Sequence, residues 1–104
     1  MIDFLHVVPE AGIFIWDTRK AAINIYRHGI SFKNAVLVFA DPERMMSIDD
    51  LHSADEMRHF CVGMVNGRVV TVRFTYREEK IRVIGAGYWR KGRRLYEKKK
   101  MERP

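Results

Sequence analysis

The sequence predicts a single α+β domain in which two N-terminal helices precede an antiparallel sheet of about four strands and a basic helix ends the chain. Three observations lead to this prediction. Apolar residues recur at helical spacing over residues 32–39, β-branched runs flank the dipeptide Asn66-Gly67, and residues 88–104 are rich in Lys and Arg. The chain has 104 residues, which is enough for one domain and too few for two.

A short strand is predicted near the beginning of the chain. Residues 13–16, IFIW, are apolar and rich in β-branched and aromatic side chains, as strands are. Pro9 and Gly12 argue against regular structure in residues 1–12. We therefore expect the first regular element to begin at about residue 13.

The first helix is predicted to run from Asp17 to about His28. Asp17 is a suitable N-cap, and Gly29 can end the helix in the left-handed conformation. Lys20, Asn24 and His28 lie four residues apart and therefore share one face. Another face, which is expected to pack on the core, consists of Ala22, Ile25 and Tyr26.

The second helix is predicted to follow after two residues. Ser31 is a suitable N-cap for it. Its apolar positions have the i, i+3, i+4, i+7 spacing of a helix face that packs on a core. These positions are Phe32, Ala35, Val36 and Phe39.

The sheet is predicted over the second half of the chain. Asn66-Gly67 is the preferred dipeptide of a type I′ hairpin turn, and residues 77–80 form a second tight turn. A polar loop is expected over residues 49–56. The predicted strands are residues 44–48, 58–65, 68–76 and 81–86.

A two-residue turn at 78–79 fixes the register of the last two strands. It places Thr75 opposite Arg82, and Arg73 opposite Ile84. One face of the sheet is then apolar and must cover the core. The other face is polar, and its three arginines suit it to bind anions. Its residues are Thr71, Arg73, Thr75, Arg77 and Arg82.

The positive charge of the chain is concentrated at its end. The net charge is +6, and residues 88–104 contain eight Lys or Arg but only two Asp or Glu. The remainder of the chain is therefore neutral. Clustered cations favour a nucleic acid or another acidic partner, although a solvated terminal helix has the same composition.

The cysteine content and the hydropathy pattern exclude other classes of protein. Cys61 is the only cysteine, so an intramolecular disulfide is excluded, and its apolar neighbours predict a buried structural thiol. No apolar stretch approaches the length of a transmembrane helix, and Asp3 stands where a signal peptide would be positively charged. We expect a cytoplasmic protein without a membrane partner.

The stretch FIWDTRKAAINIYRHGISFKNAVLVFAD, residues 14–41, resembles the opening signature of the BrnT family of toxins. The positions that match this signature are Trp16, Asp17, Lys20, Asn24, His28, Gly29, Ser31, Phe32, Ala35, Phe39 and Asp41. The later part of the chain follows the family pattern at Arg58, Gly63, Thr75, Arg77, 81–84, Ala86 and 93–97. We therefore expect a BrnT-like toxin domain over residues 13–98, an N-terminal extension over 1–12 and a basic tail over 99–104.

The resemblance implies a RelE-like fold and a ribonuclease toxin of a type II toxin–antitoxin pair, which inhibits translation. The implied partners are an RNA substrate and a ribbon-helix-helix, BrnA-like antitoxin, with promoter DNA bound only through the antitoxin. We expect no cofactor. No metal is expected either, because His6, His52 and His59 lack acidic or thiol partners at metal-ligand spacing.

A metal-independent ribonuclease must activate the ribose 2′-OH, stabilise a charged phosphorane and protonate the leaving 5′-oxygen. Arginine suits the second task because its charge is permanent and its contacts are bidentate. From charge and resemblance together, the catalytic candidates are Arg77, Arg82, Tyr96 and His28. The candidates for RNA binding are Lys20, Arg73, Arg90 and Arg94.

Each candidate also has a structural interpretation. The arginines could form surface ion pairs with nearby carboxylates, and His28 could interact with the dipole of the helix that it ends. Tyr96 could pack in the core rather than donate a proton. Tyr88 and Trp89 could stack on RNA bases or be buried against the sheet.

The chain departs from the family at the end of the last predicted strand. The family usually has Ile-Ser-Ala-Arg where this chain has IGAG, residues 84–87, so Gly85 and Gly87 replace a serine and an arginine. Arg93 stands where the family commonly has glutamate. These departures leave a second interpretation open, in which the protein is a catalytically degenerate BrnT-like module that pairs with an antitoxin and co-represses its promoter.

Overall fold

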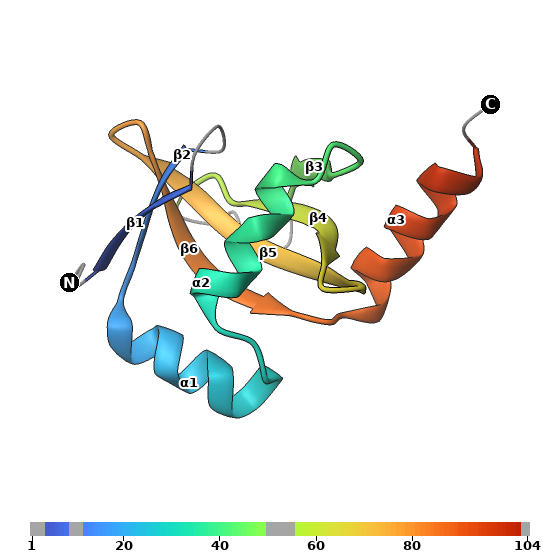
Figure 1. Cartoon of the computed structure of the whole chain (residues 1–104). Coiled ribbons are helices and arrows are strands. Elements are labelled where there is room, and N and C mark those ends of the chain that lie inside the picture. Colours follow the sequence, from blue (N-terminus) through green and yellow to red (C-terminus); the bar gives the residue numbers. More distant parts are fainter. Residues whose placement is uncertain (1–3, 9–11, 50–55, 103–104) are drawn as a thin grey trace.

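A computed structural model describes residues 4–8, 12–49 and 56–102, and within these residues six strands form one mixed sheet flanked by helices (Figure 1). The elements are β1 (Phe4–Val8), β2 (Gly12–Trp16), α1 (Thr18–His28), α2 (Phe32–Ala35), the 3₁₀ helix η1 (Val36–Ala40), β3 (Met45–Ile48), β4 (His59–Val65), β5 (Arg68–Arg77), β6 (Lys80–Gly87) and α3 (Arg90–Met101). The α+β class and the C-terminal basic helix are confirmed.

The order of the strands is β1-β2-β6-β5-β4-β3, and β2–β6 is the parallel pair. The prediction of about four antiparallel strands is therefore wrong. Residues 4–8 form a strand in the segment expected to be irregular, so a β-hairpin precedes the helices; Pro9 lies outside the described residues. Parallel strands need a long crossover connection, and the segment from α1 through β5 provides it between β2 and β6.

Helix α1 begins and ends where the sequence predicts. The Asp17 carboxylate accepts hydrogen bonds from the backbone N–H groups of Arg19 and Lys20 at 2.8 and 3.1 Å. Gly29 ends the helix with a φ of 71°, and its N–H donates to the carbonyl of Ile25 at 2.8 Å. Both ends of the helix are thus fixed by local hydrogen bonds.

The face that α1 turns inward differs from the prediction. Ile25 and Tyr26, expected to face the core, have exposed fractions of 50% and 92%. Asn24 is buried instead: its amide nitrogen donates to the carbonyls of Ile30 and Ala86, both at 3.0 Å, and its amide oxygen accepts from the N–H of Ala86 at 3.2 Å. The polar side of the helix faces the sheet because it supplies these hydrogen bonds.

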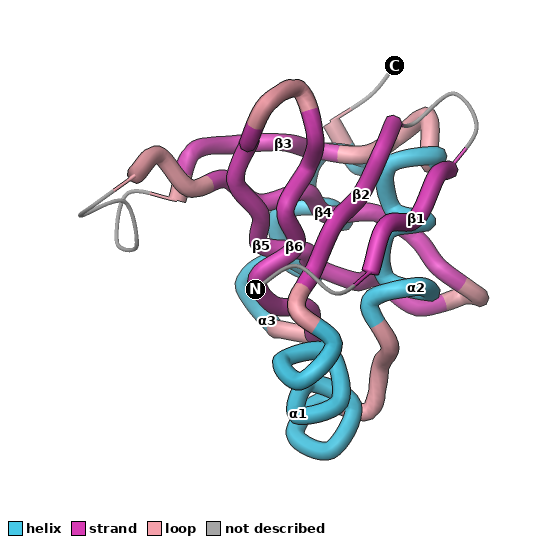
Figure 2. Tube along the Cα trace, turned by 90° about the vertical axis from the view of Figure 1, so that its left-hand side faces the viewer, coloured by secondary structure: helices cyan, strands magenta, loops and turns pink. Residues whose placement is uncertain are grey.

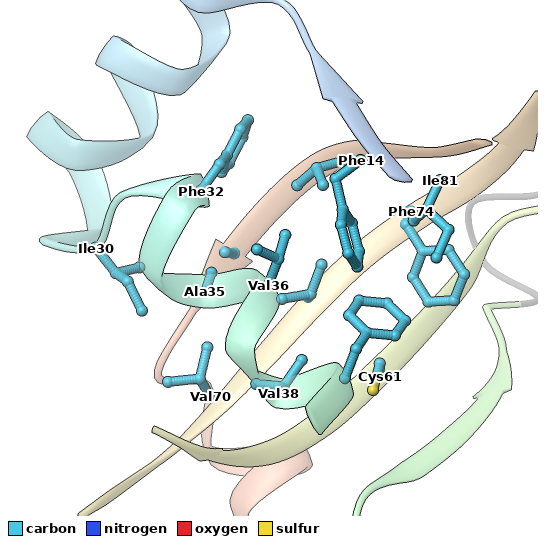
Figure 3. Packing of buried hydrophobic residues seen from close by; sticks show 14 of the residues in the cluster. Phe14, Ile30, Phe32, Ala35, Val36, Val38, Cys61, Val70, Phe74 and Ile81 are labelled. Atoms are coloured by element: carbon cyan, nitrogen blue, oxygen red, sulfur yellow. The ribbon is translucent and has the colours of Figure 1, made fainter. Parts of the chain in front are cut away.

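Helix α2 and the 3₁₀ helix η1 cover one face of the sheet (Figure 3). The hydroxyl of Ser31 caps α2 by accepting from the N–H of Asn34 at 3.1 Å, as predicted. The α-helix is only four residues long and then tightens into η1. The predicted apolar stripe is confirmed, because each of its members is buried: Phe32, Ala35, Val36 and Phe39.

The core lies between η1 and the sheet. The ring of Phe39 packs between those of Phe14 and Phe74, with centroid distances of 5.0 and 5.1 Å. Gly63 of β4 lies so close to η1 that a Cβ there would be 2.9 Å from the carbonyl oxygen of Val38. Cys61 is fully buried, as predicted, and burial raises its thiol pKa to about 12, which excludes it as a nucleophile.

The bulge in the last hairpin changes the polar face. The predicted turns are present, since residues 66–67 and 78–79 have positive φ angles, and Thr75 lies opposite Arg82 as expected. A register shift at Arg73 then places this residue opposite Gly85, and the prediction that it faces Ile84 is wrong. Strand β6 continues to residue 87, so both departing glycines lie in the strand, on the polar face.

Helix α3 packs on the polar face, on the side of the sheet opposite α2 (Figure 2). Gly92 lies directly on Thr71 of β5, and a Cβ at this glycine would overlap the Thr71 hydroxyl oxygen. One helical turn later, the buried Tyr96 donates a hydrogen bond of 2.6 Å to the carboxylate of Asp41. Two specific contacts therefore hold a helix that has few apolar residues.

We predict that Gly92→Ala lowers the melting temperature measured by circular dichroism. Alanine favours an isolated helix by about 1 kcal/mol, but overpacking against Thr71 costs about 1–3 kcal/mol and prevails. Arg93→Ala, at the exposed neighbouring position, is the matched control and should leave the melting temperature nearly unchanged. The double variant Gly92→Ala/Thr71→Ala should recover part of the loss. A Gly92→Ala protein as stable as the wild type would contradict this packing.

Candidate functional site

Trp89 lies in the short connection between β6 and α3, and its indole covers the end of the polar face where Gly85 and Gly87 lie. Its indole covers Gly87 so closely that a Cβ at this glycine would lie 2.6 Å from Trp89 Cε2. Gly85 is also in contact, since its Cβ position is 3.9 Å from Trp89 Cη2. The indole therefore occupies the space that a side chain at residue 87 would require, and it lies in ordinary contact with residue 85. Trp89 is half-buried. It therefore combines the two interpretations given for it above, because one part of the indole is buried against the sheet and another part is free to stack on an RNA base.

A pocket of about 210 Å³ lies between Trp89 and helix α1, and we call it the α1 pocket. The rings of His28 and Trp89 are in T-shaped contact, with an angle of 80° between their planes and a centroid distance of 5.3 Å. The lining also contains Arg73 from β5 and two cations from α1. The lining residues are Lys20, Ile23, Asn24, Arg27, His28, Arg73, Ile84, Gly85 and Trp89.

The α1 pocket brings together three of the predicted site residues, namely Lys20, His28 and Arg73. It adds Arg27, which the sequence analysis missed. The signal for Arg27 was present, because it follows Lys20 by seven residues and therefore lies on the same side of the helix. Three cationic side chains and one imidazole in a single pocket can bind a phosphate and transfer a proton.

A second pocket, of about 200 Å³, lies on the other side of Trp89, beside helix α3, and we call it the α3 pocket. Trp89 and Arg73 line both pockets. The Arg73 guanidinium lies 5.9 Å from the indole centroid, and its Nε is 3.4 Å from the carboxylate of Asp49. The other lining residues are Asp49, Phe60, Thr71, Lys91, Gly92 and Leu95.

Arg77 and Arg82 lie toward the other end of the polar face. Arg77 follows Arg73 by four residues in β5, which corresponds to about 13 Å along the strand. It is exposed and forms an ion pair with Glu56 at 3.4 Å. The hydroxyl of Thr75 donates to the carbonyl of Met57 at 2.8 Å, so residues 56–57 lie against this end of the face. The structure does not bring these two arginines to His28.

Tyr96 has the structural role that was the alternative for it. Its hydroxyl is buried and donates to Asp41, which also accepts the N–H of Met64 at 2.8 Å. Burial, and then the hydrogen bond to Asp41, raise the pKa of Tyr96 to about 12. A buried phenol with this pKa is not available to an RNA substrate, and the structure therefore gives no support to a catalytic Tyr96.

Arg90 and Arg94 lie on the exposed side of α3 and line a shallow depression together with Lys91, Leu95 and Lys98. They are outside both pockets beside Trp89. Tyr88, the other aromatic residue of the connection, packs against the core, with the Arg68 guanidinium 3.4 Å from its ring centroid.

Within residues 4–8, 12–49 and 56–102, no three histidine, cysteine or acidic side chains are grouped as they would be around a metal ion. In the same part of the chain, no helix has the length and apolar character needed to cross a membrane.

Comparison with known proteins gives one family. The model of the family described as "Ribonuclease toxin, BrnT, of type II toxin-antitoxin system" matches residues 16–92, and these include both pockets except Leu95. No curated protein matches the chain.

We predict that Tyr96→Phe lowers the free energy of unfolding by about 1.5–3 kcal/mol at pH 8, because it removes a hydrogen bond to a carboxylate. The neutral Tyr96 hydroxyl makes its full contribution to the free energy of unfolding below pH 10, the ordinary pKa of a tyrosine. Between pH 10 and about 12 the unfolded chain loses its phenol proton while the folded chain keeps it, so this contribution is lost as the pH rises. Urea titrations should therefore show the difference between wild type and Tyr96→Phe shrinking over this range.

The matched control for Tyr96→Phe is Tyr26→Phe, since Tyr26 is 92% exposed and should contribute little at any pH. If the difference in the free energy of unfolding between wild type and Tyr96→Phe stays constant from pH 8 to pH 12, the Tyr96 hydroxyl is not buried and hydrogen-bonded to Asp41 as described.

Proposed function

Because the chain belongs to the BrnT family of ribonuclease toxins of type II toxin–antitoxin systems, we propose that it is a metal-independent endoribonuclease that inhibits translation by cleaving RNA. The observation that supports this most strongly is the α1 pocket, where Lys20, His28 and Arg73 line one cavity. They supply a base for the 2′-OH and cations for the charged phosphorane, which are two of the three requirements of cleavage without a metal.

In the proposed mechanism His28 is the general base. It accepts the proton of the ribose 2′-OH, and the 2′-oxygen attacks the adjacent phosphorus. The bond between phosphorus and the 5′-oxygen breaks, and the leaving oxygen takes a proton from solvent. The products are a 2′,3′-cyclic phosphate and a 5′-hydroxyl, and the imidazolium then returns its proton to solvent. Arg73 and Lys20 stabilise the charge that develops on the phosphorane.

We assign the remaining cationic candidates to binding rather than to bond cleavage. Arg77 and Arg82 continue the polar face on one side of the α1 pocket, and Arg90 and Arg94 lie on α3 on the other side. A strand of RNA that crosses the pocket would place its flanking phosphates near both groups. Because such contacts release counterions, substitutions at these four positions should weaken binding more at low salt than at high salt and make the affinity less dependent on salt.

Membership of the family implies an antitoxin partner and an RNA target. We propose that the antitoxin is a ribbon-helix-helix, BrnA-like protein and that the pair binds promoter DNA through the antitoxin. The fold is proposed to be RelE-like, which is supported by α2 and η1 on one side of the sheet and the C-terminal helix on the other.

One observation favours a second candidate function. The Trp89 indole occupies the polar face above Gly85 and Gly87, where the resemblance to the family leads us to expect a serine and an arginine. A protein that has lost a catalytic arginine in this way could act as a binding module that retains its antitoxin and co-represses a promoter. In that case the chain would bind RNA or its partner without cleaving RNA.

We predict that the purified chain cleaves single-stranded RNA in the presence of EDTA and leaves 2′,3′-cyclic phosphate ends. Arg73→Ala should lower the cleavage rate by about 100-fold or more, because it removes a contact to the developing charge. Arg77→Ala, the matched control on the same strand, should lower it only a few-fold. Gel analysis of a labelled RNA, with circular dichroism to verify folding, measures both effects.

Equal losses for the two variants would place the reaction away from the α1 pocket. Cleavage that EDTA abolishes would contradict a metal-independent reaction. If the folded wild-type chain leaves RNA intact at high concentration, the binding-module function replaces the ribonuclease function.

A further inference from the structure

The proposed mechanism uses the α1 pocket and leaves the α3 pocket without a role. The walls of the α3 pocket are apolar and aromatic: Trp89 stands on one side, and Phe60 and Leu95 contribute the others. Its rim is cationic, because Lys91 is exposed and Arg73 lines the boundary between the two pockets. A volume of about 200 Å³ is sufficient for the ring system of one nucleobase.

The side chain of Phe60 reaches this pocket because of its position in β4. The next residue, Cys61, is buried in the core, so Phe60 faces the opposite side of the sheet. It lies opposite Arg73 on β5 and opposite Ser47 on β3. A large aromatic side chain in the middle of a polar face, half-exposed and beside an arginine, is not explained by the core.

We propose that the α3 pocket binds one nucleobase of the RNA, stacked on Trp89 and Phe60, and thereby sets the sequence preference of cleavage. A nucleobase has two apolar faces and is attached to an anionic backbone, which matches aromatic walls and a cationic rim. This proposal rests on the proposed function in one respect only, namely that RNA is the molecule that the protein binds.

The shared residues determine which base enters. Arg73 lines both pockets and Trp89 separates them, so a phosphate held in the α1 pocket and a base in the α3 pocket belong to neighbouring positions of one strand. The Asp49 carboxylate, paired with Arg73 Nε at 3.4 Å, also lines the α3 pocket and can accept a hydrogen bond from an amino group on the edge of a base.

An apolar side chain of a protein partner is the alternative occupant. The charge of the surroundings favours RNA, since Lys91, Arg90 and Arg94 lie on the same helix beside the pocket. A protein anchor would have no use for this cationic rim unless its flanking residues were acidic. The experiment below separates the two occupants because its ligand is RNA alone.

The test measures the affinity of labelled, uncleavable 2′-O-methyl oligoribonucleotides by fluorescence anisotropy. An abasic residue is placed at each position of the probe in turn. For the wild type, one position should be sensitive, with about a tenfold to hundredfold loss of affinity when its base is missing. Phe60→Leu, which keeps an apolar side chain, should show a similar loss for the complete probe and no further loss for the probe that is abasic at that position.

Tyr76→Leu is the matched control, because Tyr76 is an exposed aromatic residue of the neighbouring strand on the other face of the sheet, and it should bind like the wild type. Leu95→Ala is a second pocket variant, should Phe60→Leu fail to fold, and should reduce the sensitivity to the same abasic position. Sequencing of cleavage products should show a broader base preference for Phe60→Leu at one position next to the cut.

The outcomes separate this proposal from the proposed function. Single-position sensitivity in a chain that does not cleave RNA would support the base pocket and reject the ribonuclease. The base pocket is rejected if wild type and Phe60→Leu cleave with the same base preference and bind every probe with equal affinity. The α3 pocket would then be assigned to an apolar side chain of a protein partner.

Discussion

The position of helix α1 depends on one side-chain amide. Strand β2 pairs with β6 only at Ile81 and Arg82, so the edge of β6 has no strand beside it farther along. Asn24 supplies there the donor and the acceptor that a strand would offer to Ala86, and it holds the carbonyl of Ile30 as well. Any apolar residue in place of Asn24 would leave these three buried backbone groups without a hydrogen-bond partner. Because α1 is held in this way, its cations and its last residue face the polar side of the sheet.

Most of the signature that the chain shares with its family stabilises the fold. Asp17, Gly29 and Ser31 end or begin helices, and Asp41 joins the end of η1 to β4 and α3. These roles involve nearby backbone or single buried contacts, so each depends on the spacing of these residues in the chain. Lys20 and His28 belong to the same signature and line the α1 pocket at the surface, where the proposed mechanism gives each of them a role.

What could be predicted from the sequence was local. The helix caps, the two tight turns and the apolar stripe of α2 depend on residues within a few positions of one another, and each is present in the structure. The inward face of α1 could not be predicted, because Asn24 has its partner 62 residues away. The bulge at Arg73 likewise depends on how two strands fit together, and it moved Gly85 and Gly87 beneath Trp89. For the site, the sequence indicated the cations but not which of them share a pocket.

The central proposal for this protein is that RNA binds on the polar face with a phosphate between α1 and Arg73. The most direct measurement is a nuclear magnetic resonance titration of the ¹⁵N-labelled chain with an uncleavable 2′-O-methyl oligoribonucleotide. We expect the largest amide shifts at His28, Arg73 and Gly85 and in the connection to α3. Shifts confined to the opposite face, for example at Met46 and Ile48 of the edge strand β3 or at Leu37 of η1, would contradict this proposal.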